Sequence, residues 1–328
     1  MTFLKKKITL IFALLLMIGT VLAGCGSNSA NGGTSYPEKN IKLLVPWNAG
    51  GDTDVINRVA AKYLEKELGV KIIVQNIGGG SGSIGAKEAM GAAADGYTIL
   101  AGHDSIGISK LMGQTDFDYS AFEPVALLTS APQLIATHVD NPWNSMQDVV
   151  DQLKSEPESI SFGASIGSTS HIVPLGIMDR AEVKFNIVGY DGTAKRTTAL
   201  LGQHLDFGAT TIPAAKEYMK ANQLKILGIA TEERTPALPD VPTLIEQGID
   251  FTNATNRGYF APEGTPEDVV KAFSDAVAKV AENPDFIKEM EDMGVEVRYM
   301  DYKEYSQYLK DDVEFLEGML KRQGVIEE

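Results

Sequence analysis

The chain has 328 residues with a formal net charge of -15 at pH 7, and 44% of its residues are hydrophobic. This acidic balance argues against binding to nucleic acid and against electrostatic adhesion to anionic lipid, because both partners are themselves negatively charged. The sequence beyond residue 35 is longer than a typical single domain and has ample apolar residues for a core, so we expect it to form two lobes.

The N-terminus has the pattern of an export signal. Lysines at residues 5–7 precede an apolar run over residues 8–21, and Leu-Ala-Gly-Cys then ends at Cys25. The run is shorter than the ~20 residues that a helix needs to cross a bilayer, which favours a cleaved signal over a permanent span. The Leu-Ala-Gly-Cys segment resembles the lipobox of bacterial lipoproteins. We therefore predict a signal peptide at residues 1–24, a lipidated Cys25 and a flexible tether over residues 25–35.

Strand and helix patterns alternate in the first third of the chain. The predicted order is strand 41–45, helix 55–68, strand 71–75, glycine loop 78–85, helix 86–94 and strand 97–100. The strands are short apolar runs, and the first helix repeats its apolar residues at helical spacing. Such alternation predicts right-handed crossovers and a parallel sheet.

A second α/β unit follows in the middle of the chain. Its predicted elements are strand 159–162, helix 169–180, strand 185–188, helix 194–201, strand 205–209, helix 214–221 and strand 225–230. We interpret two extended apolar stretches, residues 125–139 and 253–261, as the two crossings of a hinge. A further helix is expected with Thr265 as its N-cap and Pro266 as its first residue. A final amphipathic helix over residues 302–320 is expected to pack back on the first lobe.

One glycine loop matches a nucleotide-binding motif. Gly80, Gly82 and Gly85 fit the G-x-G-x-x-G pattern of dinucleotide-binding loops, and Asp104 follows about 20 residues on. The predicted export argues against this interpretation, since nicotinamide cofactors are cytoplasmic. The alternative is a glycine turn that lets a helix pack closely against a strand. We favour this alternative and predict no cofactor.

A second loop matches a hydrolase motif. Residues 163–167 read Gly-Ala-Ser-Ile-Gly, which fits the G-x-S-x-G pattern of serine hydrolases. His171 lies too close to Ser165 to be the usual late triad histidine, and His204 lies between a predicted helix and a strand. The next helix is expected to start near residues 168–170, so Ser165 would lie inside a loop and not at a sharp apex. We favour a binding protein over a hydrolase that uses Ser165, which stays the alternative.

Two loops are suited to holding carboxylate groups. Residues 46–53 contain glycines that leave backbone N–H groups free, and the start of the next helix adds positive partial charge. Residues 165–170 have the same chemistry with added hydroxyl groups. Facing each other across a cleft, the loops would clamp a ligand with two acidic ends, with Trp47 as core residue or pocket wall and Tyr190 within reach. The four histidines lack metal-ligand spacing and Cys25 is the single cysteine, so no metal site and no structural disulfide is predicted.

The order of these motifs resembles the extracytoplasmic solute receptors of the tripartite tricarboxylate transporter family, also called Bug receptors. The resemblance runs from Tyr36 to nearly the C-terminus. Its landmarks, in the family's order, are residues 36–37, 41–45, 45–54, 78–85, 95–98, 122–125, 163–171, 189–192, 238–243 and 261–266. Their shared order is far more specific than any one of them.

This resemblance implies an α/β, two-lobed periplasmic-binding-protein-like (type II) fold in which each lobe is a central sheet flanked by helices. Residues 36–130 with 258–328 would form the first lobe, and residues 131–257 the second. The implied function is not enzymatic: the receptor captures a small carboxylate, such as a di- or tricarboxylate or related organic acid, between its lobes. It then delivers the ligand to a permease with large and small integral-membrane subunits. We expect a monomer outside the cytoplasm, anchored to the cell membrane through Cys25.

The resemblance also implies which loops hold the ligand, largely through backbone amides and waters. The residues predicted to bind it are Trp47, Ala49, Gly50, Gly51, Asp54, Ser165, Gly167, Ser168, Thr169, His171, Tyr190 and Asp206. Two departures change the charge near the cleft: Asp191 stands where Lys is common, and Lys195 with Arg196 replaces a usually apolar or small pair. A ligand-sensing subunit of a signalling system is a further alternative.

Overall fold

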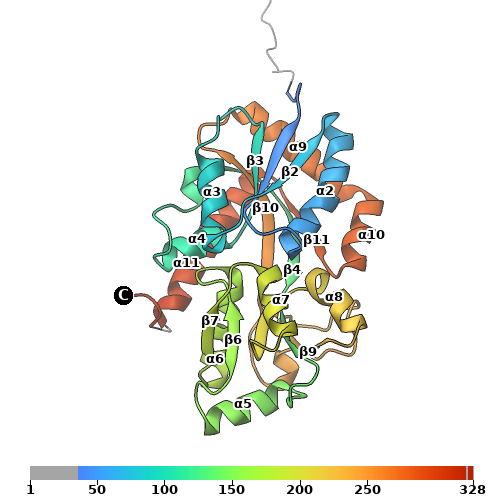
Figure 1. Ribbon diagram of the computed structural model, residues 1–328. Helices are drawn as coiled ribbons and strands as arrows, with labels where there is room; N and C mark the ends of the chain where they lie inside the picture. Colours follow the sequence, from blue (N-terminus) through green and yellow to red (C-terminus); the bar gives the residue numbers. More distant parts are fainter. Residues whose placement is uncertain (1–35, 323, 328) are drawn as a thin grey trace, which may run out of the picture. The chain divides into compact units, whose positions relative to one another are not determined.

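The computed structural model describes residues 36–322 and 324–327. The predicted signal peptide at residues 1–24, the lipidated Cys25 and the tether up to residue 35 lie outside the described residues. From Tyr36 onward the chain is one compact unit that contains a six-stranded and a five-stranded sheet (Figure 1). Among the helices described, none is both long and apolar enough to span a bilayer.

The six-stranded sheet is mixed and draws on both ends of the chain. Its strands are β1 (Ile41–Val45), β2 (Ile72–Asn76), β3 (Thr98–His103), β4 (Phe122–Pro132), β10 (Ala254–Pro262) and β11 (Glu296–Met300). The strand order is β11-β4-β10-β3-β1-β2. β1 pairs in parallel with β2 and β3, as the strand and helix alternation predicts, whereas β10 and β11 add antiparallel pairs.

Helices cover both faces of this sheet. They are α2 (Asp52–Leu68), α3 (Ser83–Met90), α4 (Ser105–Leu111), α9 (Glu267–Glu282), α10 (Pro284–Asp292) and α11 (Tyr302–Arg322), with short 3-10 helices η1 (Gly80–Gly82) and η2 (Tyr119–Ala121). Side chains of α2, α9 and α10, including Ile56, Phe273 and Phe286, are buried in the core on one face. Tyr305 and Leu309 of α11 are buried in the core on the other face.

The five-stranded sheet is formed by the middle of the chain. Its strands are β5 (Leu134–His138), β6 (Ser161–Ala164), β7 (Asn186–Gly189), β8 (Phe207–Thr210) and β9 (Leu224–Ile229), in the order β7-β6-β8-β5-β9. Its helices are α5 (Met146–Ser155), α6 (Thr169–Ala181), α7 (Thr193–Leu201) and α8 (Ile212–Lys220), with η3 (Ile245–Gln247). β6 is parallel to β7 and β8, and β5 is antiparallel to β8 and β9.

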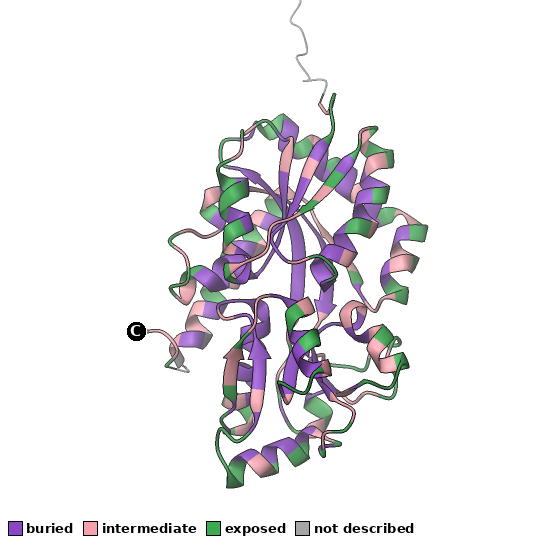
Figure 2. Ribbon diagram, in the orientation of Figure 1, coloured by how far each residue is buried: buried purple, intermediate pink, exposed green. Residues whose placement is uncertain are grey.

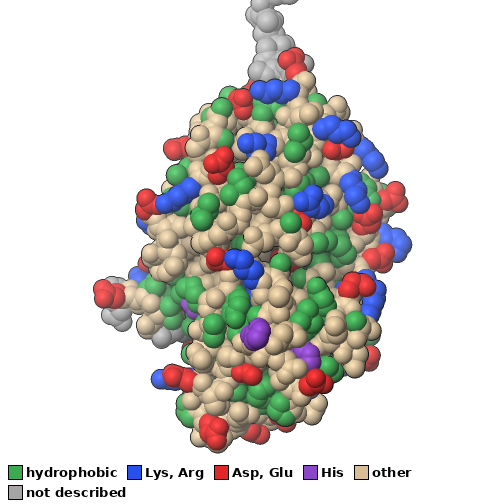
Figure 3. Space-filling view, in the orientation of Figure 1, with side chains coloured by type: hydrophobic (Ala, Val, Ile, Leu, Met, Phe, Trp, Pro, Cys, Tyr) green, Lys and Arg blue, Asp and Glu red, His purple; other side chains and the backbone are tan. Residues whose placement is uncertain are grey.

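The burial pattern follows these layers. The inner strands of both sheets are buried along most of their length, whereas the edge strands β2, β7 and β11 are mostly half-buried or exposed. The helices turn one face to the core and one to solvent (Figure 2). On the surface in view, basic and acidic side chains are interspersed and do not gather into a single large patch (Figure 3). The structure is therefore the predicted α/β fold, with two sheets that are each flanked by helices.

The chain crosses between the sheets twice. Gln133 separates β4 from β5, so the apolar stretch predicted over residues 125–139 is two strands in different sheets. The chain returns after η3 and enters β10 at Ala254. The lobe boundaries placed after residues 130 and 257 stay a prediction.

Gly85 lies in the first turn of α3, close to the residues that directly follow β1 and β2. A Cβ atom at Gly85 would lie 2.6 Å from the carbonyl oxygen of Ile77 and 2.7 Å from Cα of Pro46. Both contacts are with backbone that cannot move aside easily, so residue 85 must be glycine for the helix to approach this closely.

One local prediction is wrong at the start of α9. The helix begins at Glu267, and its N-cap is Pro266, with an extended ψ of 138°. The hydroxyl of Thr265 instead donates to the carbonyl of Pro262 at 2.7 Å. Thr265 therefore closes the turn before the helix and does not cap it.

Candidate functional site

A cavity of about 20 Å³ lies between the two sheets. It is lined by Trp47, Asp52, Thr53, His103, Gln133, Ser165, Ser168, Thr169, Ser170, Gly192, Thr193, Arg196, Thr255 and Arg257. α2 begins at Asp52, α6 at Thr169 and α7 at Thr193, so three helix N-termini meet at the cavity. Their free N–H groups and partial positive charge favour a negatively charged ligand.

Asp52 connects the two sides of the cavity. Its carboxylate accepts hydrogen bonds from Thr193 Oγ1 at 3.0 Å and from Thr211 Oγ1 at 3.2 Å, both just beyond strands of the five-stranded sheet. It also forms a buried ion pair with Arg257 of β10. Burial alone would raise the pKa of Asp52, but the charge of Arg257 and the hydrogen bond from Thr193 help to lower it. The carboxylate is therefore ionised at neutral pH.

Arg196 of α7 is buried, with 3% of its surface exposed. Its Nε donates to the carbonyl of Ala209 at 3.0 Å, its Nη1 to Ser165 Oγ at 2.8 Å and its Nη2 to Thr193 Oγ1 at 3.1 Å. Burial lowers the pKa of Arg196 to about 10, partly offset by the charge of Asp52, so the guanidinium stays charged at neutral pH. Each Nη atom carries a second N–H that these bonds do not use.

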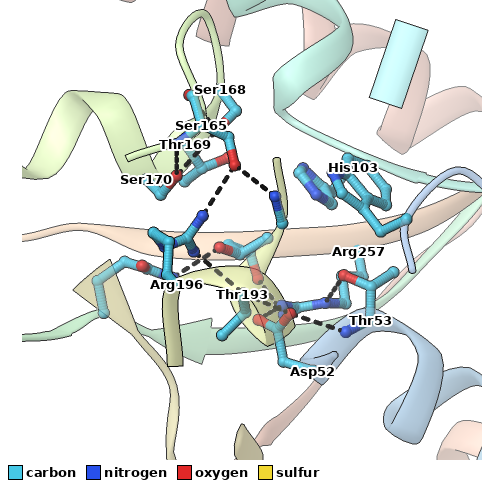
Figure 4. A pocket seen from close by; sticks show the side chains of 14 residues that line it. Asp52, Thr53, His103, Ser165, Ser168, Thr169, Ser170, Thr193, Arg196 and Arg257 are labelled. Atoms are coloured by element: carbon cyan, nitrogen blue, oxygen red, sulfur yellow. Dashed lines mark hydrogen bonds and ion pairs between the residues drawn. The ribbon is translucent and has the colours of Figure 1, made fainter. Parts of the chain in front are cut away.

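Arg257 is equally buried on β10. Its Nε donates to Thr53 Oγ1 and its Nη1 to the carbonyl of Thr255, each at 3.1 Å, while Nη2 contacts Asp52. Burial lowers the pKa of Arg257, and the charge of Asp52 opposes this shift. In Figure 4, Thr193 lies between the Arg196 and Ser165 side and the Asp52 and Arg257 side of the cavity.

One wall of the cavity is an aromatic stack. The rings of Trp47 and His103 lie 3.8 Å apart between centroids with an interplanar angle of 11°. His103 Nδ1 accepts from the backbone N–H of Ser105 at 3.2 Å and lies 2.9 Å from its hydroxyl oxygen. Burial, then the charge of Arg257, lowers the pKa of His103 well below its usual value. His103 is therefore a neutral ring at neutral pH.

The loop after β6 faces this wall with hydroxyl groups. Ser165 Oγ donates to the carbonyl of Tyr190 at 2.8 Å and accepts from the backbone N–H of Gly192 at 2.9 Å. Ser168 is the N-cap of α6, and its Oγ lies 3.0 Å from that of Ser170. Thr169 Oγ1 is buried without a hydrogen-bond partner among the described residues. The loop thus supplies polar groups to the cavity, one of which is unsatisfied.

The structure brings part of the predicted site together at the cavity. Trp47, Ser165, Ser168 and Thr169 line it. Three other predicted residues, Gly51, Gly167 and His171, lie close in sequence to residues that line the cavity. Gly51 is the N-cap of α2, directly before Asp52, and the Gly167 N–H donates to His171 Nδ1 at 3.3 Å. Burial lowers the pKa of His171 to about 4, so this ring too is neutral.

The remaining predicted residues do not line the cavity. Ala49 and Gly50 are exposed, and Asp54 accepts from the Gly50 N–H at 2.9 Å and so braces the loop. Tyr190 offers its backbone carbonyl to Ser165, while its side chain packs in an apolar cluster. Asp206 accepts from the backbone and hydroxyl of Ser161, outside the cavity lining.

The charged residues of the cavity were not predicted as ligand contacts. Arg196 carried a signal, because a charged residue there departs from the family pattern. Asp52 lay inside the predicted loop and had no distinguishing signal of its own. Arg257 is 205 residues from Asp52 in sequence, so no local pattern could place the two together. Within the described part of the chain, no group of three or more His, Cys, Asp or Glu residues is arranged to hold a metal ion.

Further hydrogen bonds cross between the two halves beside the cavity. Ser81 Oγ donates to the carbonyl of Ile166 at 2.7 Å, and the Ser81 N–H donates to Asp191 Oδ1 at 3.1 Å. Ser109 Oγ donates to the carbonyl of Gly167 at 2.7 Å. The loop with the dinucleotide-like pattern therefore contacts the opposite half of the molecule.

Known proteins resemble this chain in architecture and in sequence. A family model described as "Tripartite tricarboxylate transporter family receptor" matches residues 56–325. The UPF0065 protein in the TAR-I ttuE-ttuC' intergenic region of Agrobacterium vitis is 30% identical over 266 residues, which are 79% of this chain and 76% of that protein. The periplasmic binding protein BugD superposes with a TM-score of 0.84 at 28% identity, covering 89% of this chain and all of that one.

A second solved structure, MatC from Rhodopseudomonas palustris with bound malate, has a TM-score of 0.79 at 27% identity and covers 86% of this chain and 99% of its own. The family match spans most of the chain, and both structures share its two-sheet architecture. The chain therefore belongs to the tripartite tricarboxylate transporter receptor family, whose members are solute-binding proteins that act outside the cytoplasm.

Proposed function

We propose that this receptor captures a small carboxylate in the cavity between its sheets and delivers it to a permease with large and small integral-membrane subunits. The observation that carries the proposal is Arg196, a buried guanidinium with unused N–H donors at a point where three helices begin. Charge-assisted hydrogen bonds to a carboxylate are the interaction that such a site favours. The malate in the related MatC structure supports a small organic acid as ligand.

The contacts expected in the bound state follow from the cavity lining. Trp47 would cover one side of the ligand, and Ser165, Ser168 and Thr169 would offer hydroxyl and backbone N–H groups from the other. The test is a thermal-shift and calorimetry screen of mono-, di- and tricarboxylates, acidic amino acids and aromatic acids. A ligand at about 100 times its dissociation constant should stabilise the protein by about 2.7 kcal/mol. A screen in which no acid raises the melting temperature would reject the proposal.

We further propose that residues 36–130 with 258–328 move as one lobe and residues 131–257 as the other. The hydrogen bonds from Ser81 and Ser109 to the opposite half would break on opening and form on closure. Small-angle scattering of the monomer should show a smaller radius of gyration with ligand than without. An unchanged radius at saturating ligand would argue against lobe closure.

Covalent labelling of Ser165 separates the receptor from a hydrolase. Ser165 Oγ donates to a backbone carbonyl and not to a histidine, which favours a structural role for this hydroxyl. We therefore expect no labelling of Ser165 by diisopropyl fluorophosphate and no turnover of carboxylic esters. Labelling that disappears in Ser165→Ala would instead indicate an enzyme.

The position of the receptor in the cell is proposed from Cys25, which lies outside the described residues. Lipidation there would anchor the receptor to the cell membrane within reach of its permease. Cells that express the full chain should incorporate labelled palmitate into the protein, and Cys25→Ser should abolish incorporation and release the protein from the membrane fraction. Membrane retention of Cys25→Ser would contradict the anchor.

A further inference from the structure

We propose that the ligand is a carboxylate with a single negative charge, and that Asp52 sets this preference by neutralising one of the two guanidinium groups of the cavity. The inference rests on the proposed capture of a carboxylate and narrows the class of acid. It makes Asp52 and Arg196 the residues that determine specificity in this chain.

The first step is the charge balance of the cavity. Among its lining residues, Asp52, Arg196 and Arg257 carry charge, while His103 is neutral. Asp52 pairs with Arg257, so their charges cancel. The hydrogen-bond partners of Arg196 are two hydroxyl groups and a backbone carbonyl, all uncharged. The cavity thus holds one positive charge that no neighbouring anion pairs in the structure described.

The second step is the cost of each charge on a ligand. Arg196 is only 3% exposed, and a buried charge without a partner is costly. One ligand carboxylate would neutralise it. A second ligand carboxylate could interact with the partial positive charges of the helix N-termini but would find no unpaired cation. It would also lie in the same small cavity as the ionised carboxylate of Asp52. Like charges brought together in a buried site repel strongly, because little water is present to screen them.

The third step concerns the rest of the ligand. Thr169 Oγ1 is buried without a hydrogen-bond partner among the residues described, and Ser168 and Ser170 line the same cavity. The opposite wall is the flat face of Trp47 on His103. These groups suit an uncharged polar group, such as a hydroxyl, keto or amide group, on a short carbon chain.

The test uses pairs of acids that have the same shape and differ by one charge. Malonate, succinate and glutarate are each compared with their monoamides, malonamate, succinamate and glutaramate, by calorimetry on the unmodified protein at neutral pH. Three chain lengths separate the effect of charge from that of size. In the pair that fits best, the monoamide should bind at least about tenfold more tightly than the diacid.

Variants assign the preference to residues. Asp52→Asn removes the negative charge while keeping the side-chain shape, and it should shift the ratio of the two affinities by at least about tenfold towards the diacid. Glu67→Gln removes a charge from an exposed position of the same helix and should leave the ratio unchanged. Arg196→Gln should weaken every acid, whereas Lys195→Gln, its exposed neighbour, should not. Circular dichroism and melting temperature establish that each variant is folded.

Each outcome decides a separate point. If neither this panel nor the wider screen of acids contains a ligand, carboxylate capture itself fails. If the only acids that bind in the wider screen carry two or more negative charges, capture stands and the preference for a single charge is overturned. If acids bind and the diacid of the best pair binds as tightly as its monoamide, capture stands and the preference for a single charge is overturned. If the preference is present but Asp52→Asn leaves the ratio unchanged in a folded protein, Asp52 is not its cause. The comparison on the unmodified protein decides the ligand charge even where a variant fails to fold.

Discussion

The hydroxyl of Thr193 donates a 3.0 Å hydrogen bond to the carboxylate of Asp52, which is 141 residues away in sequence and belongs to the opposite half of the molecule. Thr211 donates to the other oxygen of the same carboxylate. Asp52 therefore holds the two halves together in addition to pairing with Arg257. Loss of these bonds should favour an open cleft.

We predict that Thr193→Val and Thr211→Val each weaken ligand binding by about tenfold, because a hydrogen bond to a charged group contributes about 1.5–3 kcal/mol. Valine keeps the shape of threonine but cannot donate. Calorimetry measures the affinity, and small-angle scattering measures the share of open molecules. Thr198→Val is the matched control, since this exposed hydroxyl of α7 donates within its own helix. Equal affinities in all three variants would contradict the role of Asp52 in closure.

The stability of the protein should depend on pH through a buried pair of carboxyl groups. Asp104 Oδ1 and Asp312 Oδ2 are both buried without a hydrogen-bond partner among the described residues. Burial, and then the charge of Asp312, raises the pKa of Asp104 well above its usual value. Burial raises the pKa of Asp312 to about 6, against the opposing charge of Arg298.

The direction of the effect follows from these raised values. The folded state binds the proton more tightly than the unfolded state, in which the pKa of Asp is about 3.9. The stabilisation is therefore full below about pH 4 and is lost as the pH rises through about 6. In urea unfolding, the contribution of this pair to the free energy of unfolding should fall by on the order of 2 kcal/mol between pH 4 and 7. Asp312→Asn should flatten that slope, and an equally steep slope in the variant would exclude this origin.

A glycine substitution tests the close packing at the first turn of α3. Gly85→Ala should lower the free energy of unfolding by about 1–3 kcal/mol, because the new Cβ would meet the backbone of Ile77 and Pro46. Gly91→Ala at the end of the same helix is the control, since its nearest contact would be 3.6 Å away. Chemical denaturation of both variants gives the comparison. Similar stabilities would mean that the loop can shift to accept a side chain.

Trp47 should report ligand binding by fluorescence. The chain has two tryptophans, and Trp143 lies in the core of the five-stranded sheet, away from the cavity. A ligand in the cavity would change the surroundings of the ring that stacks on His103. Titration of Trp143→Phe should therefore retain the ligand-dependent emission change, and titration of Trp47→Phe should lose it. A signal that persists in Trp47→Phe would place the ligand elsewhere.

The local sequence pattern was sufficient to predict the parallel part of the six-stranded sheet. The strand over residues 41–45 and the helix that ends near Leu68 could be predicted because their apolar spacing is set by neighbours in sequence. The pairing of β10 and β11 with β4 could not be predicted, because these strands are far apart in the chain and no local period encodes antiparallel pairing. The short helix α4 likewise carried no recognised signal.

The candidate site shows the same division. Trp47 and Ser168 could be identified because they belong to loops that precede helices and have the chemistry to bind anions. Arg257 could not be identified, because its role depends on the buried ion pair with Asp52, a residue distant in sequence that only folding brings close. Arg196 could be noticed as unusual, but only its position in space shows that it lacks an acidic partner in the described structure.

The position of β10 also limits the order in which the molecule can be assembled. β10 lies between β3 and β4, so these two strands cannot be joined into one sheet until residues 254–262 are available. The five-stranded sheet uses one uninterrupted segment, from Leu134 to Ile229, and has no such requirement. Pairing of distant segments is slow because a long loop must first be closed. A chain emerging from its N-terminus would therefore complete the five-stranded sheet over residues 134–229 first, and β3 would stay unpaired along one edge until the C-terminal third is available.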